Sequence, residues 1–97
     1  MILGRITDPT GAVIQGAVVE AKNIDTGVRS TAPTNATGDF LLPFLIPGPY
    51  IVTVEAPGFK KWVRSRIQTR IDDRITIDVT MEIGQATESV QVSAEAP

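Results

Sequence analysis

The clearest fold signal in the sequence lies in residues 75–83, which read ITIDVTMEI. Every second side chain in this run is large and apolar, and the side chains between them are polar or charged. Successive side chains of a β-strand point to opposite faces, so the pattern predicts a strand with one face in a core and the other in water. The residues expected to face the core are Ile75, Ile77, Val79, Met81 and Ile83.

Residues 50–56 alternate in the same way, with Tyr50, Val52, Val54 and Ala56 on one face, and other runs predict five further strands. Gly, Pro, Asn and Asp residues separate these runs, as they commonly separate strands. The five strands are expected at residues 2–7, 13–23, 28–32, 39–42 and 62–71, the second with a bulge near Gly16. The composition agrees, because ten Val, eleven Ile and eleven Thr residues stand against only four Leu. β-Branched side chains favour strands over helices.

Seven short strands with one apolar face each predict an all-β protein. The expected fold is a seven-stranded antiparallel β-sandwich with Greek-key connections, which covers residues 1–83. Residues 84–97 contain no basic side chain and few large ones, so we expect a linker or an extra β-strand leading to a downstream domain. Val90 and Val92 alternate in this tail, and they are the residues expected to pair with an exposed sheet edge.

The composition excludes several classes of function. The chain has 97 residues, with nine Lys and Arg, eleven Asp and Glu, and neither Cys nor His. Without Cys and His, we expect no disulfide scaffold, zinc site, haem ligation or Ser-His-Asp triad, and no cofactor. A net charge of −2 argues against nucleic-acid binding. No apolar run reaches the length of about 18 residues that a membrane-spanning helix needs.

Five turn motifs follow one another along the chain. They are Gly4-Arg5-Ile6-Thr7-Asp8 with Gly11, Gly16-Ala17-Val18-Val19, Asn35 with Gly38-Asp39-Phe40, Leu45-Ile46-Pro47-Gly48-Pro49-Tyr50, and Ala56-Pro57-Gly58-Phe59. In this order and spacing they resemble the carboxypeptidase regulatory-like domain, a family close to the Cna protein B-type domains. The resemblance covers residues 3–83 and implies a prealbumin-like (transthyretin-like) β-sandwich. Its structural residues would be Gly11, Gly38, Gly48 and Gly58 in turns, and Tyr50 and Phe59 in the core.

The tail from Glu88 to Ala94, followed by Pro97, resembles the join between such a domain and the plug of a bacterial TonB-dependent outer-membrane receptor of the Oar-like type. The resemblance implies a non-enzymatic structural or docking module of an exported protein, in the periplasm and outer membrane or at the cell surface. Its partner would be the plug and barrel of the same polypeptide, and self-association through the tail is a second interpretation. The family also carries the looser label of a carbohydrate-binding-like fold, which by itself assigns no function.

One candidate binding surface lies in the run of residues 62–71. The period-2 spacing puts Trp62, Arg64, Arg66 and Arg70 on the outward face of this strand. An exposed Trp beside Arg side chains can stack on a sugar ring, bind an acidic partner or contact lipid headgroups. The alternative function is therefore a carbohydrate-binding module. The other interpretation is a solvated face without a ligand.

A remoter alternative rests on Asp25-Thr26-Gly27, because such a triplet carries the catalytic carboxylate of homodimeric aspartic proteases. The residues that follow, Val28-Arg29-Ser30, depart from the protease pattern. Asp followed by Thr-Gly is also a common turn. We therefore expect a turn here, and no enzyme.

Two other chemistries are expected to be absent. The resemblance places the lysine of a Cna-type isopeptide bond at Ile6, and the only lysines are Lys22, Lys60 and Lys61. Asp72-Asp73 lacks a third spaced acid and is flanked by arginines. A turn is therefore expected at this pair rather than a calcium site, which needs more clustered oxygen ligands.

Overall fold

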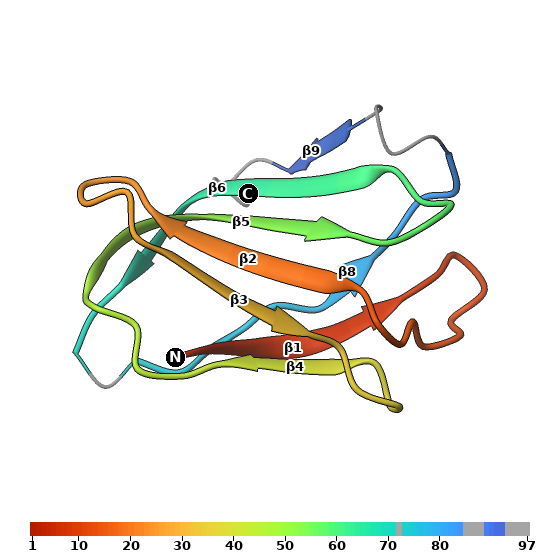
Figure 1. The fold of residues 1–97 in the computed structure, drawn as a ribbon, viewed down its shortest axis with the longest axis horizontal. Coiled ribbons are helices and arrows are strands. Elements are labelled where there is room, and N and C mark those ends of the chain that lie inside the picture. The colour runs from red at the N-terminus through yellow and green to blue at the C-terminus, as the bar shows by residue number, and fades with distance from the viewer. Residues whose placement is uncertain (72, 85–88, 93–97) are drawn as a thin grey trace.

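The computed structural model describes residues 1–71, 73–84 and 89–92, the last of these by their backbone only. These residues form two β-sheets that pack face to face (Figure 1). The strands are β1 (Ile2–Thr7), β2 (Val18–Asn23), β3 (Arg29–Pro33), β4 (Asp39–Leu42), β5 (Gly48–Glu55), β6 (Lys61–Thr69), β7 (Ile75–Thr76), β8 (Val79–Thr80) and β9 (Ser89–Val92). No helix occurs among the described residues, and so none of them forms a membrane-spanning helix.

The larger sheet has the strand order β3-β2-β5-β6-β9, and the smaller one places β1 between β4 and the short strands β7 and β8. β5 pairs with β2 rather than with its chain neighbour β4, which lies in the other sheet. Connections that cross between sheets and return in this way are characteristic of Greek-key sandwiches. The all-β sandwich expected from the sequence is therefore confirmed.

Three details differ from that expectation. The pairings of β1 with β7 and β8, and of β6 with β9, are parallel, so both sheets are mixed rather than antiparallel. The strand expected over residues 75–83 is divided into β7 and β8. The strand expected over residues 13–23 begins only at Val18, because Gly16 adopts a φ of 80° in the preceding loop. Alternation along one strand indicates its two faces but not the direction or the continuity of its pairing.

The core lies between the sheets. Its buried apolar side chains are Ile2, Ile6, Ala17, Val19, Ala21, Phe40, Leu42, Tyr50, Val52, Val54, Ala56, Trp62, Ile67, Ile77, Val79 and Met81. In residues 50–56 all four side chains expected to face the core are buried. In residues 75–83 the three central ones are buried, whereas Ile75 is half-buried and Ile83 is exposed. The alternation therefore predicted the core faces of these two runs well, except at the ends of the second.

Gly4 permits a close crossing between β1 and the segment that contains β7 and β8. A Cβ atom at this position would overlap the backbone oxygen of Ile77 and stand 2.6 Å from its carbonyl carbon. The N–H of Ile77 donates a hydrogen bond to the oxygen of Leu3 over 2.7 Å. Because no side chain fits between these backbones, only glycine preserves the crossing as it stands.

Candidate functional site

Trp62 does not lie on a surface. Its side chain is only 7 % exposed and belongs to the core cluster. Trp62 on β6 pairs with Val54 on β5, and Val54 is fully buried. Directly paired residues share a face of the sheet, so the tryptophan also faces the core. The expectation of an exposed tryptophan, on which the carbohydrate-binding alternative rested, is wrong.

A β-bulge interrupts the alternation of β6. At the bulge, two residues of β6, Ser65 and Arg66, lie opposite a single residue of β5. Arg66 has a φ of 60°. The extra residue puts Trp62 and Ile67 on the same face, although an odd number of positions separates them. Arg66 and Arg70 are exposed, but Arg70 lies beyond the end of β6. The four residues expected to share one outward face therefore do not form one.

Arg64 lies on the core side of β6, because it pairs with the fully buried Val52. Its side chain is half-buried, and its Nε atom is buried without a hydrogen-bond partner among the described residues. A buried donor without a partner costs free energy. Arg64 therefore belongs to the margin of the core and not to the surface predicted for it.

Part of the C-terminal tail adds a strand to the larger sheet. β9 pairs in parallel with β6, with Val90 opposite Trp62 and Val92 opposite Arg64. Residues 85–88 and 93–97 lie outside the described part of the chain. Because parallel strands run in the same direction, the chain at Val92 heads toward the end of the sandwich at which β6 finishes (Figure 1).

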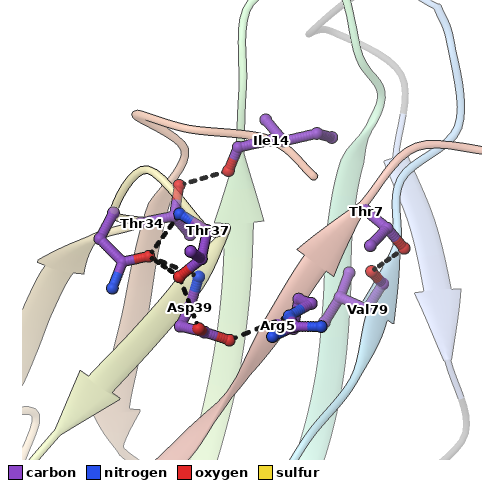
Figure 2. Close-up of polar contacts among 8 residues, drawn as sticks. Arg5, Thr7, Ile14, Thr34, Thr37, Asp39 and Val79 are labelled. Carbon is purple, nitrogen blue, oxygen red and sulfur yellow. Dashed lines mark hydrogen bonds and ion pairs between the residues drawn. The ribbon is translucent and has the colours of Figure 1, made fainter. Parts of the chain in front are cut away.

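A shallow groove of about 410 Å³ lies on the outer face of the smaller sheet. It is lined by Leu3, Gly4, Arg5, Thr7, Asp39, Phe40, Thr76, Asp78, Val79 and Thr80. The Nε atom of Arg5 donates to Oδ1 of Asp39 over 3.1 Å, and the hydroxyl of Thr7 donates to the oxygen of Val79 over 3.3 Å (Figure 2). Several polar groups of the groove thus bind one another, and none of its aromatic rings is exposed for stacking.

Asp39 has a well-defined electrostatic environment in this groove. The hydroxyl of Thr37 lies 2.7 Å from its Oδ2 atom, on the side opposite the contact with Arg5 (Figure 2). The hydrogen bond from Thr37, followed by that from Arg5, lowers the pKa of Asp39 below its ordinary value. A general acid or base at neutral pH needs a pKa near 7. A carboxyl with a lowered pKa stays ionised at neutral pH, so Asp39 suits an ion pair with Arg5 rather than proton transfer.

Asp25-Thr26-Gly27 forms an exposed turn between β2 and β3. The side-chain oxygen of Asn23 accepts the N–H groups of Asp25 and Thr26 at 2.9 and 3.0 Å, and Gly27 has a φ of 76°. An aspartic protease needs two such carboxylates close enough to share a proton. Asp25 instead lies in an exposed turn, and the hydrogen bonds and the glycine of this turn account for the presence of Asp, Thr and Gly in sequence.

The residues expected in turns and in the core can all be placed. Gly11, Gly38, Gly48 and Gly58 have positive φ angles, but Gly48 is the first residue of β5 rather than a turn residue. At Gly38 a Cβ atom would also stand 2.8 Å from the backbone oxygen of Ile6, so this turn packs tightly on β1. Tyr50 is buried and donates its hydroxyl hydrogen to the oxygen of Ile46, and Phe59 is half-buried against the core.

The positions considered for an isopeptide bond and a metal site have other environments. Ile6 is fully buried in the core, and Asp78, which lies where the last long strand would supply the bond's Asn or Asp, is exposed on the outer face of the smaller sheet. Among the described residues, no three His, Cys, Asp or Glu side chains gather as metal ligands. Asp72 lies outside the described residues, so the pair with Asp73 is not placed.

Exposed apolar side chains gather at one end of the sandwich. This end, the loop end, consists of residues 24–28, 43–47 and 70–74 (without residue 72), which connect β2 to β3, β4 to β5, and β6 to β7 (Figure 1). Its exposed apolar residues are Ile24, Val28, Phe44, Ile46 and Ile71. A hollow of about 80 Å³ separates the first two loops. Pairing of Gly48 with Thr69 brings the third loop beside the second.

Phe44 is the extreme case at the loop end. Its side chain is 98 % exposed, and its φ of 57° lies in the left-handed region. That conformation costs a residue with a Cβ atom about 1–2 kcal/mol, and no burial of the ring offsets it. The sequence offered one signal, an apolar run over residues 41–46 that Pro43 interrupts, but it did not indicate which of these side chains would be exposed.

Comparison with known proteins identifies the family. A family model of carboxypeptidase regulatory-like domains matches residues 1–82. The chain belongs to this family. The resemblance expected from the order of the turn motifs is thus confirmed. The regulatory-like domain also matches the TonB-dependent transporter Oar from Myxococcus xanthus, with 27 % identity over 110 aligned residues. The match covers 100 % of this chain and 10 % of the transporter, so the chain spans about a tenth of this curated relative's length.

Solved structures share the fold of the regulatory-like domain. A chain from a type II cohesin–X-dockerin complex of Acetivibrio cellulolyticus has a TM-score of 0.69 and 20 % identity, over 86 % of this chain and 57 % of that one. A candidate carbohydrate-binding protein from Bacteroides uniformis has a TM-score of 0.65 and 19 % identity, over 82 % of this chain and 40 % of that one. At such identities the likeness establishes the fold alone.

Proposed function

We propose that this regulatory-like domain is a non-enzymatic interaction module of a bacterial TonB-dependent transporter, exported to the outer membrane. The observation that carries the proposal is the likeness to the Oar transporter. That likeness covers the whole chain, including the tail that follows the family match at residue 82. Both the sandwich and its C-terminal continuation therefore have counterparts in a transporter.

The direction of β9 supports a partner located beyond the tail. β9 runs parallel to β6, which finishes at the loop end. A downstream plug and barrel would then follow on the side of the exposed apolar loops.

The electrostatics of the described acidic residues support a module without catalysis. The pKa values of Asp8 and Asp39 are lowered, first of all by hydrogen bonds from the hydroxyls of Thr10 and Thr37 respectively. Catalytic acids and bases are generally shifted toward the working pH instead. These carboxylates act as structural acceptors.

The test uses the full-length protein that contains this chain. Deletion of residues 1–82 should leave the rest of the protein in the outer-membrane fraction but lower its TonB-dependent uptake. The Asp25→Asn and Asp39→Asn substitutions should leave uptake unchanged, because neither carboxylate takes part in a reaction. A cytosolic location, or uptake that is unaffected by the deletion, would contradict the proposal.

A further inference from the structure

The loop end differs from the rest of the surface in how its apolar side chains are presented. Phe44 and Ile71 are 98 % and 78 % exposed and occupy separate loops, and Ile46 is 57 % exposed. The hollow between the first two loops measures only about 80 Å³. Where the structure describes the loop end, this hollow is too small to receive a partner's large side chains, and the apolar side chains stand as separate exposed tips.

The area of these tips is small for a protein interface. At about 25 cal/mol per Å², the transfer free energy of a buried Val, Ile or Phe corresponds to roughly 60–120 Å² each. Five such side chains, about two-thirds exposed, present roughly 200–400 Å² of apolar area. A specific dimer buries about 800 Å² on each partner. A second copy of this chain would therefore gain too little from these tips alone.

We propose that the loop end contacts a phospholipid bilayer, with Phe44, Ile46 and Ile71 inserted into the interfacial region. A bilayer accepts apolar side chains individually and requires no matching shape. The strained φ of Phe44 fits this role, because it holds the ring outward where the folded domain itself gains nothing from it. The inference rests on the proposed function only in that a transporter would hold the module beside a membrane.

Charge selects the kind of bilayer. The described residues of the loop end include two acids, Asp25 and Asp73, and two bases, Arg70 and Arg74, so their charges balance. Attraction to anionic lipid is therefore small, and zwitterionic headgroups suit this surface. Arginine side chains can also extend from inserted loops to lipid phosphates. Binding should consequently depend on apolar insertion and change little with salt.

The first experiment is flotation of the 97-residue chain with vesicles of phosphatidylcholine and phosphatidylethanolamine, at low and at high salt. Ile71→Ser and Ile83→Ser form a matched pair, because the two isoleucines are 78 % and 72 % exposed but Ile83 lies outside the loop end. We expect Phe44→Ser to weaken the partition into vesicles about tenfold and Ile71→Ser to weaken it severalfold. Ile83→Ser should leave the partition unchanged.

Phe44→Gly separates binding from folding. Glycine relieves the left-handed strain and removes a ring that makes no core contact, so the variant should melt at a higher temperature and still lose vesicle binding. A Phe44→Trp variant reports insertion directly, through a blue shift on vesicles and quenching by brominated lipid. The native Trp62 is buried and gives a constant background. Leu41→Trp, on an exposed position of β4, is the control that should not shift.

Three results would overturn the inference: no flotation of the wild-type chain, equal losses in Ile71→Ser and Ile83→Ser, or binding that disappears at high salt. Concentration-dependent dimers that Phe44→Ser abolishes, without vesicle binding, would assign the loop end to self-association instead. The outcome is independent of the deletion test, since a module that ignores vesicles can still be needed for uptake.

Discussion

Gly4→Ala offers a sharp test of the packing between β1 and the segment of β7 and β8. The new Cβ atom would overlap the backbone oxygen of Ile77, so the two backbones must separate by about 1.5 Å to reach ordinary contact. The hydrogen bond from the N–H of Ile77 to the oxygen of Leu3, now 2.7 Å long, would then exceed the length of a hydrogen bond. Ile77 itself is only 2 % exposed and would lose part of its burial.

The expected cost is about 3 kcal/mol. A buried N–H left without a partner costs about 1–3 kcal/mol, and partial exposure of one isoleucine adds about 1 kcal/mol. Domains of this size are stable by about 5–15 kcal/mol, so the loss is a large fraction of the total. The melting temperature should fall by about 10–20 °C. The sign is diagnostic, because Gly→Ala at a compatible strand position would stabilise the protein.

The assay is urea and thermal unfolding followed by circular dichroism. Gly58→Ala is the matched control, since Gly58 has a φ of 80° but nothing lies within 4 Å of a Cβ atom there. This control measures the cost of a Cβ atom at a positive φ, about 1 kcal/mol, without steric overlap, whereas Gly4 has no positive φ and Gly4→Ala tests the overlap itself. If Gly4→Ala costs no more than Gly58→Ala, the crossing of β1 is not as tight as described, and the reasoning is refuted.

Three further predictions follow from single side chains. Asn23→Ala should lower the free energy of unfolding by about 2 kcal/mol in a urea titration. The reason is that the side-chain amide is only 2 % exposed and its oxygen accepts hydrogen bonds from two backbone N–H groups of the β2–β3 turn, so a loss under 0.5 kcal/mol would contradict this role. Trp62 should fluoresce as a buried indole, with acrylamide quenching severalfold weaker than for free tryptophan and no response to soluble polysaccharides; strong quenching would place it on the surface after all. The lowered pKa of Asp39, caused first by Thr37 and then by Arg5, means that its stabilising effect is present above the ordinary value of 3.8 and is lost as the pH falls through the lowered pKa. Asp39→Asn should therefore reduce the drop in melting temperature on acidification below that value, and an unchanged drop would argue against the ion pair.

The strands of the core were predictable where the backbone follows one uninterrupted ladder. Residues 50–56 alternate without a break, and each side chain assigned to the core is buried. The Asp25-Thr26-Gly27 turn was also predictable, because its hydrogen bonds and its glycine act within a few residues of sequence. Such features depend on local geometry, which the sequence encodes directly.

The predicted binding surface was wrong because of a single extra residue. Strict alternation along residues 62–71 predicted that Trp62 faces the solvent. The bulge at Ser65 and Arg66 reverses the face on which the preceding side chains of β6 lie, so Trp62 faces the core. Bulges occupy one residue and leave no strong mark in composition. Which half of the strand faces the core depends on its register with β5, a contact between distant parts of the chain.

By itself, the sequence determined the all-β class, the positions of the principal turns and the family, because alternation, β-branching and turn glycines are local properties. Only the tertiary structure decided that Trp62 is buried, that Gly4 lies beneath a crossing backbone and that Phe44 is left exposed. The physical reason is that burial is a property of two surfaces. The chemistry of a side chain determines whether burial is favourable for it. The register and packing of distant strands determine whether it is buried.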